Sequence, residues 1–233
     1  MLGLPDTITV ALFDLDGVLT STAVLHRKAW KQAFDTYLSG RDEPFVPFTE
    51  QDYLDYVDGR PRIDGVRTFL HSRGIDVGDD VADAIGTGKN DEFLAAVERG
   101  EVEPYPGSVR YLTQAQQGGL SIGVVTSSKN GKAVLEAAGL THFVEHRVDG
   151  NDIVGRGLRG KPAPDSYLAG AAAFDAEPKN AAVFEDALSG LEAGRAGGFG
   201  YVVGIDRVGG GDHAEAMRAA GADVVVNDLA ELL

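Results

Sequence analysis

The sequence has no cysteine, one tryptophan and two methionines among its 233 residues. The absence of cysteine excludes disulfides, thiolate metal sites and a cysteine nucleophile, and it fits a reducing compartment. No segment approaches the roughly 18 consecutive apolar residues that a membrane span needs. The opening stretch, MLGLPDTITV, also lacks the basic start and long apolar core of a signal peptide. We therefore expect a cytoplasmic protein that does not bind membranes.

Basic residues are also in short supply. The chain has 21 Lys and Arg against 36 Asp and Glu, a formal net charge of −15. This charge repels nucleic acids and anionic lipid surfaces, so we expect no nucleic-acid partner. With 43% hydrophobic residues, the chain has the composition of a globular protein and is long enough for one large domain or two smaller ones. We expect it to be a monomer.

Short apolar segments recur along most of the chain. Residues 8–13, ITVALF, are typical of a strand that is buried on both faces. Similar segments lie at residues 120–126, 181–186, 200–205 and 222–228, with helical patterns between them. Strands that alternate with helices predict an α/β fold, a Rossmann-like parallel sheet with helices on both faces.

This alternation stops between residues 21 and 101, where the apolar residues take a helical spacing. In VLHRKAWKQAFDTYL, for example, Trp30, Phe34 and Leu38 recur at every fourth position. Pro104 and Pro106 then disfavour a continuing helix and indicate the return to the sheet. The sequence therefore predicts an α/β core domain at residues 1–20 and 102–233, with an α-helical domain at residues 21–101 inserted after the first strand.

Polar residues follow the predicted strands where each one ends. They are Asp14, Asp16, Thr126, Ser127, Ser128, Glu185 and Asp186. Ligands of open parallel sheets bind beyond the carboxyl ends of the strands, so we expect these side chains to lie close together. Lys161, which precedes Pro162 in GKPAPD, is placed to reach the same edge.

Four carboxylates at one place raise one another's pKa unless a positive charge lies among them. Mg²⁺ is the cation that suits carboxylate, carbonyl and water oxygens. A hydroxyl and a lysine beside it make an anion site. This combination indicates phosphoryl transfer, in which Asp14 is the nucleophile and Asp16 the acid and base.

Each of these residues also has a structural explanation. Asp14 and Asp16 fit a turn, Thr126 and Asp186 fit helix N-caps, and Lys161 fits a solvated surface position. These explanations do not account for one observation: each of the groups Asp14 with Asp16, Thr126 to Ser128, and Glu185 with Asp186 follows a strand of the same predicted sheet. Two competing motifs fail: an EF-hand loop needs acids where the chain has Val18 and Leu25, and GRAGGFG has the wrong glycine spacing for a dinucleotide site.

Four stretches resemble the signature motifs of the haloacid dehalogenase superfamily, in the same order and spacing. They are FDLDGVLTST, VVTSSKNG, GKPAPD and VFEDALSGLEAGRAGGFG. The chain is most similar to the β-phosphoglucomutase-like branch, which has a helical cap after the first motif. The resemblance implies that Asp14 forms an aspartyl phosphate and that Asp16 protonates the leaving group. It also implies that Thr126 and Lys161 hold the phosphoryl group.

The resemblance further implies a Mg²⁺ site and a set of substrate-binding residues. The metal ligands would be Asp14, the carbonyl of Asp16 and Asp186, supported by Glu185. The residues implied to bind the substrate, a small phosphorylated sugar, are Thr22, His26, Gly59, Arg62, Lys89, Asn90, Ser127, Ser128, Lys129 and Asn130. Arg62 matches the arginine that grips the distal phosphate. His26 also fits a surface position, and Trp30 is more typical of a helical core.

The preferred hypothesis is a sugar phosphomutase that converts β-glucose 1-phosphate to glucose 6-phosphate. A phosphatase of a small sugar phosphate is the alternative, and a non-catalytic regulatory domain is a distant third, because Asp14, Asp16, Lys161 and Asp186 are all present. Ser21 stands where mutases of this type often have another aspartate, and residues 40–62 differ from them in length and composition. Both departures bear on the identity of the substrate.

Overall fold

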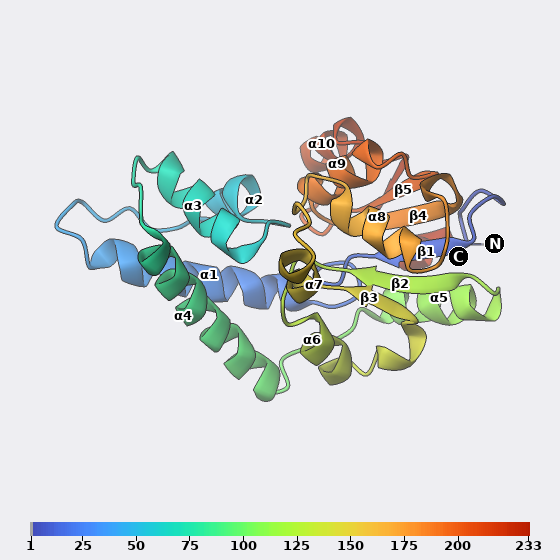
Figure 1. Ribbon diagram of the computed structural model, residues 1–233, viewed down its shortest axis with the longest axis horizontal. Helices are drawn as coiled ribbons and strands as arrows, with labels where there is room; N and C mark the ends of the chain where they lie inside the picture. The colour runs from blue at the N-terminus through green and yellow to red at the C-terminus, as the bar shows by residue number, and fades with distance from the viewer. Residues whose placement is uncertain (1) are drawn as a thin grey trace.

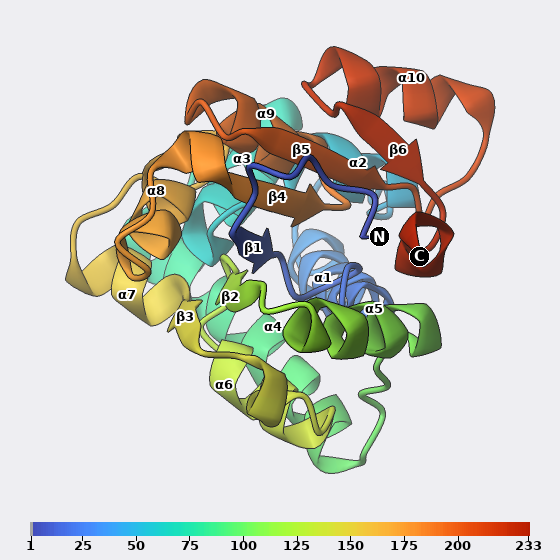
Figure 2. The same cartoon turned by 90° about the vertical axis from the view of Figure 1, so that its right-hand side faces the viewer.

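The computed structural model describes residues 2–233, and a six-stranded parallel sheet forms its centre (Figures 1 and 2). The strands are β1 (Val10–Phe13), β2 (Ser121–Val125), β3 (His146–Val148), β4 (Ala181–Glu185), β5 (Tyr201–Ile205) and β6 (Val224–Val226). Their order is β3-β2-β1-β4-β5-β6, so β1 lies between β2 and β4. The predicted α/β class with a parallel sheet is confirmed.

Helices cover both faces of this sheet, as Figure 2 shows. The helices of the first face are α5 (Pro106–Gln117) and α6 (Gly131–Ala137), and those of the second are α8 (Asp165–Ala172), α9 (Leu188–Ala196) and α10 (Gly211–Ala219). Successive strand residues point to opposite faces. Ala11 and Phe13 therefore belong to one apolar core, and Val10 and Leu12 belong to the other.

Three elements lay outside the predicted pattern. β3 has only three residues, and His146 and Arg147 are exposed, so it lacks the apolar run that marks the other strands. α5 begins at Pro106, a residue that we interpreted only as the end of the helical segment. Proline is tolerated at the first position of a helix, because the N–H that it lacks would make no hydrogen bond within the helix at that position. The third element, α7 (Gly150–Gly155), has only six residues, too few to show a repeating helical spacing of apolar residues.

Four helices lie between β1 and α5, on the left of Figure 1. They are α1 (Thr22–Ser39), α2 (Glu50–Tyr56), α3 (Arg62–Ser72) and α4 (Asp79–Glu98). Their apolar residues form a cluster separate from the two sheet cores, in which the Trp30 and Phe34 rings stack with centroids 5.0 Å apart. Trp30 is thus a core residue. We call these four helices the cap helices; the division of the chain at residues 20 and 101 stays a prediction.

Two chain segments connect the sheet to the cap helices, and they lie side by side. We call residues 17–21 the outgoing linker and residues 102–105 the return linker. The Ser21 amide donates to the Glu103 carbonyl (2.9 Å), and the Tyr105 amide donates to the Leu19 carbonyl (2.9 Å). Within the described residues 2–233, none of the helices combines the length and the apolar character required to cross a membrane.

Candidate active site

The polar residues that follow the strands meet in a cavity between the sheet edge and the cap helices. Asp14 and Asp16 follow β1, Thr126 follows β2, and Glu185 ends β4. Because neighbouring parallel strands end at the same edge, residues far apart in sequence meet there. The predicted residues that line the cavity are Asp14, Asp16, His26, Gly59, Arg62, Lys89, Thr126, Ser127, Ser128, Lys129, Asn130, Glu185 and Asp186.

Lys161 lies behind this cavity and joins two of its carboxylates. Its Nζ is 2.6 Å from Asp14 Oδ1 and 2.5 Å from Glu185 Oε1, and it donates to the Val125 carbonyl at 3.3 Å. Burial acts to lower the pKa of Lys161, but the two carboxylates outweigh it and raise that pKa above its usual value. Lys161 is therefore a permanent ammonium that holds Asp14 in place.

The carboxylates of Asp14, Glu185 and Asp186 form a compact group of oxygen ligands. One oxygen from each lies within 4.8 Å of the others. Burial raises the pKa of Asp14 well above its usual value; Glu185 and Asp16 add to this, while Lys161 opposes it. Burial and nearby carboxylates raise the pKa of Asp186 as well. A divalent cation would offset this repulsion, and the all-oxygen donor set fits Mg²⁺.

The backbone at Gly17 makes room for this group. Gly17 has φ of +85°, and a Cβ there would lie 1.7 Å from Asp186 Oδ2. Only glycine adopts this conformation without strain and lets the chain pass so close to Asp186. The glycine after Asp16 thus has two functions: it turns the chain toward the cap helices, and it leaves space for the carboxylate of Asp186, a candidate metal ligand.

Asp16 lies two residues after Asp14 but has different partners. The Thr22 hydroxyl donates to Asp16 Oδ1, and His26 Nε2 is 3.2 Å from the same oxygen. Burial acts to raise the pKa of Asp16, but His26, Thr22 and the more distant Lys89 outweigh it and lower that pKa below its usual value. Two carboxylates with opposite pKa shifts suit separate chemical roles.

His26 of α1 and Lys89 of α4 form a buried polar pair between these two cap helices. They are 8% and 5% exposed, and Lys89 Nζ contacts His26 Nδ1. The His26 ring stacks on Phe93, with centroids 4.0 Å apart. Burial and Lys89 lower the pKa of His26, and burial together with Arg62 lowers the pKa of Lys89 to about 7. His26 is therefore not a surface residue, and this pair extends from Asp16 into the cap helices.

A second polar group joins the cap helices to the loop after β2. Arg62 Nη2 donates to Asn90 Oδ1 (2.6 Å), and Asn130 Nδ2 donates to the same oxygen (2.9 Å). The Ser127 hydroxyl donates to the Gly59 carbonyl (2.9 Å). The cap helices thus lie closed against the sheet edge, and Arg62, at the start of α3, lines the cavity from the cap helices, whereas Asp14 lines it from the end of β1.

Thr126 and the loop after it complete the sheet side of the cavity. The Thr126 hydroxyl is buried and accepts from the Ser128 amide (3.1 Å), which leaves its own O–H free to donate. Lys129 also lines the cavity. Thr22, Asn90 and Lys161 are the predicted residues that do not line it. They contact Asp16, Arg62 and Asp14, respectively.

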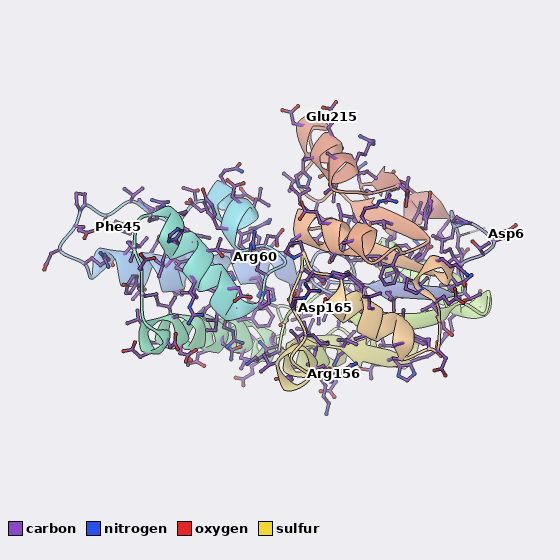
Figure 3. The ribbon with its side chains drawn as sticks, turned by 45° about the horizontal axis from the view of Figure 1, so that its top comes forward. Asp6, Phe45, Arg60, Arg156, Asp165 and Glu215 are labelled. Atoms are coloured by element: carbon purple, nitrogen blue, oxygen red, sulfur yellow. The ribbon has the colours of Figure 1, made fainter. Side chains whose placement is uncertain are left out.

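Sequence reasoning missed several residues of this region, among them Tyr167, Asp58 and Arg60. The Tyr167 hydroxyl donates to Glu185 Oε1 (2.8 Å); the sequence places Tyr167 in a helix without any sign of this role. Asp58 precedes Gly59, and burial with the carboxylates of Glu185 and Asp16 raises its pKa to about 6. Arg60 lines the cavity, and Figure 3 shows it at the junction between the cap helices and the rest of the molecule. The arginine-rich stretch DGRPR was the available signal for Asp58 and Arg60.

Comparisons with known proteins agree with this geometry. A profile of the haloacid dehalogenase-like hydrolases matches residues 8–198. The chain is 49% identical over 247 residues to a β-phosphoglucomutase of Mycobacterium bovis, covering 100% of this chain and 94% of that protein. It is 30% identical over 226 residues to the validoxylamine A 7′-phosphate phosphatase of Streptomyces hygroscopicus subsp. limoneus, covering 96% and 95%.

A solved structure extends the likeness to the fold. CbbY from Rhodobacter sphaeroides in complex with phosphate is 26% identical and superimposes with a TM-score of 0.75, covering 97% of this chain and 96% of that one. Three findings lead to one assignment. They are the parallel sheet, the helices inserted after β1 and the 49% identity, over the whole of this chain, to a β-phosphoglucomutase. The chain belongs to the haloacid dehalogenase-like hydrolase family, in its β-phosphoglucomutase-like branch.

Proposed function

We propose that the protein is a Mg²⁺-dependent β-phosphoglucomutase that converts β-glucose 1-phosphate to glucose 6-phosphate through an aspartyl phosphate on Asp14. The 49% identity to the Mycobacterium bovis enzyme supports this substrate. The observation that carries the proposal is the position of Arg62, which begins cap helix α3 and lines the same cavity as Asp14, with Asn90 and Asn130 beside it. A mutase must hold a second phosphate while the first is transferred, whereas a phosphatase needs only one anchor.

The proposed reaction has two phosphoryl transfers. A hydroxyl oxygen of β-glucose 1-phosphate attacks phosphorus on phosphorylated Asp14, and Asp16 takes the hydroxyl proton. The resulting bisphosphate turns round, Asp14 attacks its other phosphate, and Asp16 returns the proton to the leaving oxygen. The products are glucose 6-phosphate and phosphorylated Asp14. Asp16 suits the first step because its lowered pKa keeps it a carboxylate that is ready to accept a proton.

The remaining residues position charge around these transfers. Lys161 and the Thr126 hydroxyl would hold the oxygens of the transferring phosphoryl group. Mg²⁺, held by Asp14, Asp186 and the Asp16 carbonyl with support from Glu185, would supply positive charge to the same oxygens. Thr22 and His26 would orient Asp16, while Lys89, Ser127, Ser128, Lys129 and the loop at Gly59 would face the sugar and its distal phosphate.

A phosphatase that acts on a small sugar phosphate is the second candidate. The 30% identity to the validoxylamine A 7′-phosphate phosphatase supports it, and so does Ser21 in place of the aspartate that is frequent in mutases.

We further propose that the enzyme is a cytoplasmic monomer with core domain 1–20 and 102–233 and cap domain 21–101. The absence of cysteine supports the compartment.

Phosphorus NMR of the purified protein separates the candidates. The mixture contains β-glucose 1-phosphate, Mg²⁺ and a trace of glucose 1,6-bisphosphate. Glucose 6-phosphate is the expected product, and inorganic phosphate alone would exclude the mutase and favour the phosphatase. Asp14→Asn should abolish both products. Asp16→Asn, as the matched variant, should still form a phosphorylated protein from acetyl phosphate, whose carboxylate leaving group needs no proton, and mass spectrometry of the denatured protein detects it.

A further inference from the structure

Arg207 lies far from the cavity in sequence and follows β5, yet its side chain reaches the segment after Asp16. Its Nε donates to the Gly17 carbonyl at 2.8 Å, and its Nη2 donates to the Val18 carbonyl at 3.5 Å. Gly17 is the residue that packs against Asp186. Arg207 therefore holds the start of the outgoing linker, one residue away from the proposed acid and base.

The same guanidinium also contacts the return linker. It lies 3.7 Å from the centroid of the Tyr105 ring, a close cation–π contact. The Tyr105 amide is bonded to the Leu19 carbonyl, so the two linkers are paired at this point. Arg207 thus contacts both segments through which the cap helices are attached to the sheet.

A third set of contacts anchors Arg207 to the sheet side. Its Nη1 donates to the Asn227 carbonyl (2.8 Å) and lies 3.4 Å from Asp228 Oδ2. Asp228 in turn accepts from the Ala230 amide at the C-terminal end of the chain. The planar guanidinium of arginine presents separate N–H groups to acceptors on different sides while its flat face lies against a ring, whereas the lysine ammonium is a single point charge.

The buried position of Asp14 makes this anchorage relevant to function. Asp14 is 7% exposed beneath the cap helices, so a sugar phosphate reaches it only when these helices move away. Such a motion pulls on both linkers. Without an anchor on the sheet side, it would be transmitted to Gly17, to Asp16 and to the metal ligand Asp186.

We propose that Arg207 is a positioning residue that fixes the sheet-side ends of both linkers, so that Asp16 keeps its place relative to Asp14 while the cap helices open and close. The kinetic part of this inference rests on the proposed function. A displaced Asp16 would slow proton transfer to and from the sugar. An imperfectly closed cap would also admit water, which competes with the sugar for the phosphoryl group.

The test compares Arg207→Gln and Arg207→Lys with Arg195→Gln. Arg195 is a matched control, because its Nη2 also joins a carbonyl and a carboxylate, those of Gly221 and Asp223, but it contacts neither linker. Hydrogen exchange of residues 17–21 and 102–105 is measured without substrate. Phosphorus NMR then gives kcat, KM and the ratio of inorganic phosphate to glucose 6-phosphate.

We expect exchange of both linkers to rise by about tenfold in Arg207→Gln, because they lose their link to the sheet. We expect kcat to fall by about 10- to 100-fold with little change in KM, since small displacements of catalytic groups have effects of this size. The share of inorganic phosphate should rise; this ratio does not depend on how much protein is folded. Arg207→Lys should change in the same direction, and Arg195→Gln should match the unmodified protein.

Unchanged linker exchange in both Arg207 variants would overturn the proposal, as would an equal rise in inorganic phosphate in Arg195→Gln. If Arg207→Gln does not fold, Arg207→Lys decides, because it retains a positive charge beside Asp228. If the unmodified protein is a phosphatase, the exchange measurement still decides whether Arg207 anchors the linkers. The absence of mutase activity then counts against the proposed function alone.

Discussion

The Lys161 ammonium lies 2.6 Å from Asp14 Oδ1 and is 3% exposed. It bridges Asp14 to Glu185, so one buried positive charge compensates two buried carboxylates. The proposed nucleophile is thus fixed by an ion pair that connects three parts of the chain: the end of β1, the loop before α8 and the end of β4. The balance between the Lys161 ammonium and the two carboxylates therefore affects the free energy of unfolding as well as the proposed chemistry.

Replacing Lys161 by methionine should therefore destabilise the protein. Removal of one partner of a buried ion pair leaves the other uncompensated, at a cost of about 3 to 5 kcal/mol. Mg²⁺ should restore part of this loss, because it supplies positive charge to the same carboxylates. The measurement is urea unfolding with and without Mg²⁺. Lys179→Met is the control: Lys179 pairs with Glu177 on the surface, and we expect less than about 1 kcal/mol. Similar losses in both variants would contradict this account.

Lys89 should make stability depend on pH. Its pKa is lowered to about 7 in the folded protein, whereas an unfolded lysine titrates near 10.4. Between these values the unfolded chain binds more protons, so the contribution of Lys89 to the free energy of unfolding rises with pH from about 7 to about 10. As the pH rises over this range, the melting temperature of the unmodified protein should therefore increase relative to that of Lys89→Met. A difference that does not vary with pH would contradict the lowered pKa.

Gly17→Ala should weaken Mg²⁺ binding. Its Cβ would collide with Asp186 Oδ2, and the side chain can avoid this only by moving away from the proposed metal position. We expect a loss of affinity of about 10- to 100-fold, the size found when the supports of metal ligands are altered. Isothermal titration calorimetry with Mg²⁺ measures it.

Gly100→Ala is the matched control for this substitution. Gly100 also has positive φ, +74°, but nothing lies within 4 Å of the position of a Cβ there. Both variants should lose stability through backbone strain, while only Gly17→Ala should lose metal affinity. Equal Mg²⁺ affinity in the two variants would show that Asp186 is not held as proposed.

Asn130→Ala should impair the proposed distal phosphate site and the closed position of the cap helices together. Asn130 donates to Asn90, which also accepts from Arg62, so the substitution removes the bond that joins the loop after β2 to this pair. We expect KM for β-glucose 1-phosphate to rise by about tenfold, a loss at the upper end of the range for one hydrogen bond between neutral groups. Steady-state kinetics measure it.

Asn151→Ala provides the comparison for Asn130→Ala. Asn151 donates to the carbonyl of Lys129, the neighbour of Asn130, but makes no hydrogen bond to the cap helices within the described residues 2–233. It should leave KM within about twofold of the unmodified protein. A rise in KM that is as large in Asn151→Ala would show that the loop after β2, and not its link to Asn90, controls substrate binding.

The main features of the fold and the acidic centre follow from the sequence. Apolar runs such as residues 8–13 and 181–186 read as buried strands, and helical patterns between such runs require parallel connections. Carboxyl ends of parallel strands share one edge, so the placement of Asp14 and Glu185 at the same edge follows from the strand pattern. Their proximity also requires β1 and β4 to be neighbours, which the structure shows. β3 escaped prediction because an exposed edge strand of three residues has no apolar period.

Only the tertiary structure decided which partners each polar group has. Asp14 and Asp16 lie two residues apart in the sequence, which does not show their partners, yet Asp14 pairs with Lys161 and Asp16 with Thr22 and His26. The contact of Arg207 with Gly17 joins positions 190 residues apart, and no local pattern marks it. The spacing of apolar residues along the sequence indicates which residues are buried, because burial repeats with each turn of a helix or each pleat of a strand. Ion pairs and hydrogen bonds across elements depend on the relative placement of whole helices and strands, which only the folded chain defines.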